Sequence, residues 1–151
     1  MGLDQWFYIR HENYKSQYST TEPIEYPEDI PAYGYKSINH ITDYKSGYLR
    51  KANAIQNWIE TNFNLDTDIE ISVDHLKKLV NTCVEVLEDN SKASELLPTM
   101  EGFFFGTTEY DEYYFYCLKE TVKFLVPIIY FIEQKYKEGD YNWSVVYKAS
   151  W

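Results

Sequence analysis

Three polar side chains between residues 50 and 57 have the types and the spacing of a small ligand site. At roughly 100° per residue, Arg50, Asn53 and Asn57 fall within about 60° of one another on a helix. Arginine offers a forked cation for phosphate or carboxylate, and asparagine offers an amide for base or ribose edges. An ordinary solvated helix face is the alternative interpretation. Trp58 lies at the margin of this face, where an indole would cover a groove.

A second candidate segment, EGFFFGTTEYDEYY, covers residues 101–114. If the three consecutive phenylalanines are extended, their side chains alternate, so at least one of them meets a second surface. Gly106 precedes a predicted helix whose N-terminus would attract an anion. Glu109 and Asp111 lie in its predicted first turn and would repel a phosphate. The ligand contacts expected in this segment are Phe104, Thr107, Thr108, Tyr110 and Tyr113.

The chain contains no recognisable catalytic set. Its histidines, at positions 11, 40 and 75, lack metal-ligand spacing, and there is no nucleophile motif or phosphate-binding glycine loop. Cys83 and Cys117 fall on apolar helix faces, which is typical of core cysteines. Glu109 and Glu112, one turn apart, have the chemistry to bind a hard cation, but a solvated face is the preferred interpretation. We therefore expect no catalytic residue, no metal and no cofactor.

The chain is acidic and rich in aromatic residues. With 14 basic and 24 acidic side chains, its net charge is −10, which disfavours direct binding to DNA or RNA. The same charge would suit a mimic of nucleic acid, although acidity also simply maintains solubility. The 16 tyrosines each combine a flat apolar face with a hydroxyl, which suits interfaces and ligand pockets. A homodimer or higher homo-oligomer is a further expectation.

The sequence also bears on the compartment. No apolar run reaches the roughly 18 residues needed to cross a bilayer. The first ten residues lack the basic and apolar regions of a secretory signal. Only two cysteines are present, which argues against a disulfide framework. We therefore expect a cytoplasmic protein with no membrane partner.

The residue pattern predicts one α+β domain over 1–151, in which four helices form a core packed with a small antiparallel sheet. Alternating side chains predict strands over 3–10 and 142–151, which should pair with each other. Helical spacing predicts helices over 47–63, 72–90 and 92–97, and a last one from Thr107 or Thr108 to about Tyr136. Pro127 should kink or split that helix. Residues 11–46 lack periodicity and are expected to be a long irregular segment.

Four segments together resemble a family of small proteins from bacteriophage and prophage genomes. They are MGLD at the start, RKANAIQNW at 50–58, ELLPTMEGFFFGTTEYDEYYF at 95–115 and a final ASW. The family has a start like M-G-L-D-M, a Y-W-R-K-A-N-A-I-H-x-W segment, an L-L-P-T-x-x-G-F-F-F-G-S-T-E-Y-D-E-x-Y segment and an S-S-W end. This chain departs from the pattern at Leu49, where the family has Trp, and at Gln56, where it has His. If that histidine were catalytic, its absence would argue against an enzyme.

The resemblance implies a phage accessory protein, and such proteins often resemble inhibitors of host defence. Three functions are open. The leading hypothesis is a non-catalytic binder that counters host defence by sequestering a nucleotide-like immune signal. The second is an acidic inhibitor, or nucleic-acid mimic, that binds a host defence protein. The third is a metal-dependent enzyme that degrades a nucleotide signal, with Glu109, Asp111 or Glu112 as ligands.

Overall fold

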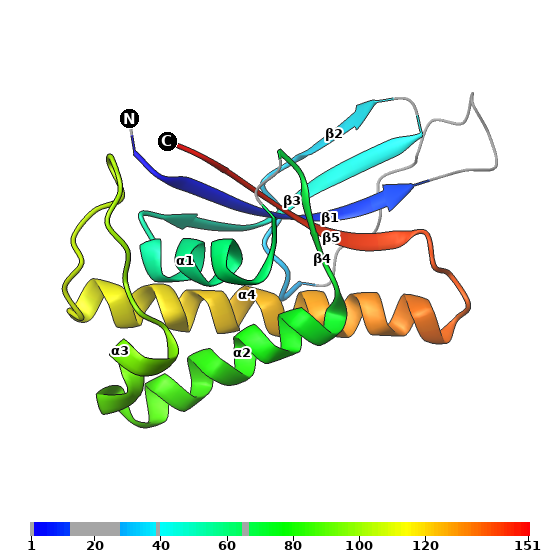
Figure 1. Ribbon diagram of the computed structural model, residues 1–151. Coiled ribbons are helices and arrows are strands. Elements are labelled where there is room, and N and C mark those ends of the chain that lie inside the picture. The colour runs from blue at the N-terminus through cyan, green and yellow to red at the C-terminus, as the bar shows by residue number, and fades with distance from the viewer. Residues whose placement is uncertain (1, 13–27, 39, 65–66) are drawn as a thin grey trace.

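The computed structural model describes residues 2–12, 28–38, 40–64 and 67–151 and has two layers (Figure 1). A five-stranded antiparallel sheet forms one layer, and the helices cover one of its faces. The predicted α+β class is confirmed, because four α-helices pack with a sheet that contains both terminal strands. In chain order the elements are β1 (Asp4–Glu12), β2 (Tyr35–Ile38), β3 (Ile41–Arg50), α1 (Asn53–Asn62), β4 (Ile69–Ile71), α2 (Val73–Glu88), the 3-10 turn η1 (Asn90–Lys92), α3 (Ala93–Leu96), α4 (Glu112–Lys137) and β5 (Trp143–Ser150).

The two terminal strands pair at the centre of the sheet. The strand order is β2-β3-β1-β5-β4, and β1 pairs antiparallel with β5 from Asp4 opposite Ser150 to His11 opposite Trp143. Phe7 and Ile9 of β1 are fully buried against the helical layer, as the alternation predicts. The prediction that the two ends of the chain pair with each other is therefore confirmed, but the sheet contains three more strands.

Strand β3 corrects the predicted start of the first helix. Gly47 lies inside this strand, where an added Cβ would come within 2.6 Å of the Phe124 ring of α4. Glycine therefore lets α4 pack directly on the sheet. The strand ends at Arg50, and Lys51 then takes a positive φ of 52°, which turns the chain before α1 begins at Asn53. Pairing with β1 outweighs the helical spacing of residues 47–52.

The predicted irregular segment over 11–46 is also wrong in part. It contains β2 and the first half of β3, and these two strands form a hairpin at the edge of the sheet. Residues 13–27 and 39 lie outside the described residues.

Helices α2 and α4 begin at side-chain caps. Helix α2 begins after Ser72, whose Oγ accepts from the His75 backbone N–H at 3.2 Å, as predicted. Helix α4 begins later than predicted, because Asp111 and not Thr108 caps it, accepting from the Tyr114 N–H at 3.0 Å. The helix runs without a break through Pro127 to Lys137. Within the described residues, no helix is both long and apolar enough to cross a membrane.

Buried amides attach the start of α1 to the sheet. The Gln5 side chain on β1 donates to the Ala52 carbonyl at 3.0 Å and accepts from the Ala52 N–H at 2.8 Å. Its Nε2 also donates to the Tyr147 hydroxyl at 3.1 Å, and that hydroxyl donates to Gln56. A central strand and β5 therefore fix the position of the first turn of α1.

Candidate functional site

A pocket of about 210 Å³ lies where the start of α1, the loop between α3 and α4, and the first two turns of α4 meet. Ala54 and Ile55 of α1 and Leu118 of α4 contribute apolar walls. Lys51 and Glu109 bring opposite charges to the same pocket. With Asp111, the pocket therefore combines apolar walls with one cation and two carboxylates.

Two asparagines of α1 hold the loop that forms one side of the pocket. Asn53 donates through Nδ2 to the carbonyls of Phe105 at 3.1 Å and Thr107 at 2.9 Å. Its Oδ1 accepts from the Met100 N–H at 3.2 Å. Asn57 donates to the Pro98 carbonyl at 2.9 Å. The Asn53 amide is thus engaged at both ends, and both asparagines position backbone.

Hydrogen bonds within the loop between α3 and α4 also stabilise it. Thr99 donates through its hydroxyl to the Thr108 carbonyl at 2.9 Å, and its backbone N–H donates to the Tyr110 hydroxyl at 3.3 Å. Gly106 has a positive φ of 86°, and a Cβ there would lie 3.2 Å from the Cβ of Lys51. A glycine at this position therefore allows the loop to close on the end of β3.

Helix α4 supplies the aromatic side of the pocket. Tyr113 donates its hydroxyl to the Arg50 carbonyl, and its ring stacks on Tyr116 at a centroid distance of 5.8 Å. Burial raises the pKa of both Tyr113 and Tyr114, so both are neutral phenols at pH 7. Burial also raises the pKa of the Cys117 thiol to about 11, which leaves it protonated and weakly nucleophilic.

The charged groups at the pocket differ in what they contact. The Asp111 carboxylate is occupied as the N-cap of α4. The side chains of Lys51 and Glu109, by comparison, make no hydrogen bond or ion pair within residues 2–12, 28–38, 40–64 and 67–151. One cation and one anion at the pocket are therefore available to a ligand.

The structure brings together only some of the residues predicted to bind a ligand. Asn53, Thr107 and Tyr113 line the pocket. The six others do not line it: Arg50, Asn57, Trp58, Phe104, Thr108 and Tyr110.

The prediction that Arg50 shares a helix face with the two asparagines is wrong, because Arg50 ends β3. Its guanidinium pairs with Asp4 at 3.0 Å on the exposed surface. Trp58 is buried in the core beside Phe63, and Phe104 is exposed at the tip of the loop.

Lys51 and Glu109 are among the pocket residues that the sequence does not identify as ligand contacts. Lys51 was counted as part of a helix, and its place at the pocket follows from its positive φ. The sequence predicts Glu109 only as a first-turn carboxylate that repels a phosphate and as one possible metal ligand. Gln56, which stands where the resembled family has His, does not line the pocket and is buried at 1% exposure against Tyr147.

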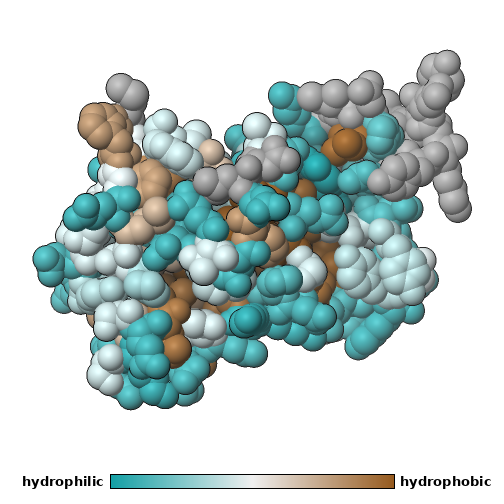
Figure 2. Space-filling view, in the orientation of Figure 1, coloured by the Kyte–Doolittle hydropathy of each residue, from teal (hydrophilic) through white to brown (hydrophobic). Residues whose placement is uncertain are grey.

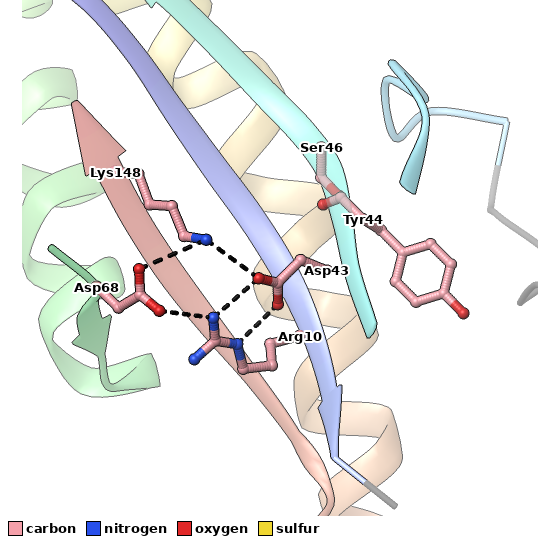
Figure 3. Close-up of polar contacts among 6 residues, drawn as sticks. All are labelled: Arg10, Asp43, Tyr44, Ser46, Asp68 and Lys148. Carbon is pink, nitrogen blue, oxygen red and sulfur yellow. Dashed lines mark hydrogen bonds and ion pairs between the residues drawn. The ribbon is translucent and has the colours of Figure 1, made fainter. Parts of the chain in front are cut away.

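A second cluster of charges lies on the face of the sheet opposite the helices and is fully paired (Figure 3). Arg10 of β1 holds Asp43 of β3 with two hydrogen bonds, at 2.7 and 2.8 Å, and Asp68 at 2.9 Å. Lys148 of β5 bridges the same two carboxylates at 3.3 and 3.4 Å. The hydrogen bond to Asp43 raises the pKa of Arg10. This cluster links three strands and leaves none of its charges without a partner.

Within the described part of the chain, no group of three or more His, Cys, Asp and Glu side chains is arranged to hold a metal ion. Comparisons with protein-family models, curated proteins and solved structures found no match to this chain.

Proposed function

We propose that the protein is a non-catalytic binding protein that holds a nucleotide-like small molecule in the pocket between α1, the loop and α4. The observation that carries this proposal is the pocket itself. It has apolar walls, and Lys51 and Glu109 beside them have no partner within the described residues. Concave apolar sites with a few well-placed polar groups are the usual form of small-ligand sites.

The size and charge of the pocket favour the base end of such a ligand. Its volume of about 210 Å³ is below the roughly 300–1,000 Å³ of sites that enclose a whole drug-sized ligand. The ring of Tyr113 lines it, and stacking on an aromatic ring contributes roughly 1–3 kcal/mol per base. Because Glu109 and Asp111 repel a phosphate, we expect the base inside the pocket and any phosphate outside it, in solvent.

The side chains at the pocket support binding without catalysis. The Cys117 thiol has a pKa of about 11, and the Asn53 amide is engaged at both ends. Asp111 caps α4. No histidine of the described residues lines the pocket. A nucleophile with an adjacent base, which covalent catalysis requires, is therefore missing from this set of lining residues.

The proposed setting is a phage accessory protein that removes a nucleotide signal of host defence. This part of the proposal rests on the resemblance to phage proteins. Two of the segments that carry it, at 50–58 and 95–115, contribute residues to the same pocket. The two segments that contain the predicted ligand contacts are thus adjacent in space.

Isothermal titration calorimetry tests the proposal with a panel of nucleosides, mononucleotides, cyclic nucleotides and ADP-ribose. We expect at least one to bind the wild-type protein with saturable heat. Ala54→Leu places a larger side chain on the pocket wall and should weaken that binding at least tenfold. Thr61→Leu adds an apolar side chain to the exposed last turn of the same helix and should leave it unchanged.

Thermal unfolding of each variant confirms that it is folded before its titration is interpreted. If wild type and Ala54→Leu bind the ligand with equal heat and affinity, the ligand binds outside the pocket. An absence of heat across the whole panel at millimolar concentration would refute the proposal.

One observation favours a second function, in which the protein binds a partner protein. The tip of the loop between α3 and α4 presents hydrophobic side chains to solvent (Figure 2). Phe103 is 78% exposed and Phe104 42% exposed, and their rings meet edge to face at 4.4 Å. Exposed apolar groups on an acidic protein suit a partner with a basic, partly apolar surface.

That alternative predicts salt-sensitive capture of a nucleic-acid enzyme from host lysate, which Phe103→Ser should abolish. Capture that is insensitive to both salt and this substitution would rule it out.

A further inference from the structure

Lys51 and Glu109 present opposite charges at one pocket without pairing with each other or with any other described residue. On the sheet face of the same molecule, Arg10 pairs with Asp43 at 2.7 Å. An unpaired cation and an unpaired anion beside apolar walls are therefore available to a polar ligand. Their chemistry narrows the class of ligand.

Both residues project from backbone that is fixed in place. The Lys51 N–H donates to the Leu3 carbonyl at 2.7 Å. The aliphatic stem of Lys51 lies against Gly106. The Glu109 N–H donates to the Thr107 hydroxyl at 3.1 Å. The backbone at both positions is therefore fixed, so binding a ligand costs only the ordering of the two side-chain ends.

The two groups require different partners. At neutral pH a carboxylate only accepts hydrogen bonds, and an ammonium only donates them. A ligand that satisfies both must present N–H donors to Glu109 and an acceptor to Lys51. The Watson–Crick edge of guanine has this pattern: a ring N–H and an amino group side by side, next to a carbonyl oxygen. Adenine offers a single amino group and a ring nitrogen, so it cannot pair with both oxygens of a carboxylate.

We infer that the pocket selects a guanine base. The carboxylate of Glu109 accepts from the ring N–H and the exocyclic amino group, and the ammonium of Lys51 donates to the carbonyl oxygen. The faces of the ring contact the apolar walls and Tyr113. This inference rests on the proposed function, because it specifies the base of the nucleotide-like ligand.

Calorimetry with guanosine, inosine and adenosine tests the inference, and nucleosides avoid the repulsion between phosphate and the acidic residues. A well-placed bidentate contact changes base preference by roughly five- to 150-fold, so we expect guanosine to bind at least about tenfold more tightly than adenosine. Inosine lacks the exocyclic amino group and should fall between them.

Two substitutions identify the responsible side chains. Glu109→Gln should bring the affinities for guanosine and adenosine within about threefold of each other. Lys51→Met keeps the aliphatic stem and should weaken guanosine binding without improving adenosine binding. The controls are Glu112→Gln and Lys119→Met, because both residues are exposed on α4 and neither lines the pocket. Both control variants should bind like the wild type.

The outcomes separate this inference from the proposed function. Binding of nucleosides with no preference for guanosine, or with a preference that Glu109→Gln does not change, overturns the inference and leaves the binding function intact. An absence of binding by every nucleoside and nucleotide overturns both.

Discussion

The two charged regions of this protein use similar residue types in opposite ways. On the face of the sheet opposite the helices, two cations and two carboxylates are all paired: Arg10, Lys148, Asp43 and Asp68 (Figure 3). At the pocket, Lys51 and Glu109 make no ion pair with any residue that the structure describes. The charges of the first cluster pair with one another, and the two charges at the pocket remain available to a ligand.

This difference separates structural charges from candidate binding charges. A partly buried ion pair that loses one member leaves an uncompensated charge, which is costly. An exposed, unpaired charge contributes little to folding, so its removal should affect binding far more than stability. The two regions should therefore respond differently to the same kind of substitution.

The largest stability effect should come from Asp43→Ala. This change leaves Arg10 and Lys148 facing each other with only Asp68, and Arg10 and Asp43 have side chains just 13% and 11% exposed. We expect the free energy of unfolding to fall by about 3 kcal/mol, measured by urea denaturation.

The matched control is Glu133→Ala, which breaks the exposed pair with Lys77 at 3.1 Å. Its expected cost is about 0–1 kcal/mol. Equal losses in Asp43→Ala and Glu133→Ala would remove the distinction between a structural cluster and ordinary surface pairs.

A smaller effect should appear as acid sensitivity. Burial opposes ionisation of Asp68, but the hydrogen bond from Arg10 and the charge of Lys148 outweigh it, so the pKa of Asp68 lies below its ordinary value. A carboxylate with a lowered folded-state pKa stabilises the fold above its unfolded pKa of about 3.9, and that stability is lost as the pH falls through the folded value.

Asp68→Asn should therefore lower the urea midpoint at pH 6 and have a diminishing effect as the pH falls below about 4. Because Asp68 is 42% exposed, the change should be modest. A pH-independent difference between wild type and Asp68→Asn would show that ionisation of this carboxylate does not contribute to stability.

The smallest stability effects should come from the pocket charges. Glu109→Gln and Lys51→Met are each expected to change the free energy of unfolding by no more than about 0.5 kcal/mol in urea denaturation. A loss above about 2 kcal/mol for either variant would show that its charge supports the fold.

The fold was predictable where the sequence pattern is local. The terminal strands follow from period-two alternation, and α2 follows from the Ser72 cap and a regular apolar stripe. Strand β3 was missed because residues 47–50 fit both a helix and a strand. Its pairing with β1, more than thirty residues away along the chain, decides between them. The close approach of Phe124 to Gly47 is equally invisible in the sequence.

The site was predictable only in outline. The segments 50–58 and 101–114 do meet, and Asn53, Thr107 and Tyr113 lie at the pocket. A helical projection from Arg50 could not reveal the turn at Lys51, because lysine is not among the residue types that favour a positive φ. That turn moves Arg50 away from the pocket and leaves Lys51 lining it.

Protection of Cys117 tests the central claim, that the pocket encloses a ligand base, most directly. Cys117 lines the pocket but is only 4% exposed, and its raised pKa makes its modification slow, whereas Cys83 is 0% exposed and does not line the pocket. Mass spectrometry would follow modification of Cys117 by a small methanethiosulfonate reagent, with and without guanosine at the concentration that saturates calorimetry. The account predicts that guanosine slows modification several-fold in the wild type and has no such effect in Ala54→Leu. An unchanged rate in the wild type under saturating guanosine would contradict it.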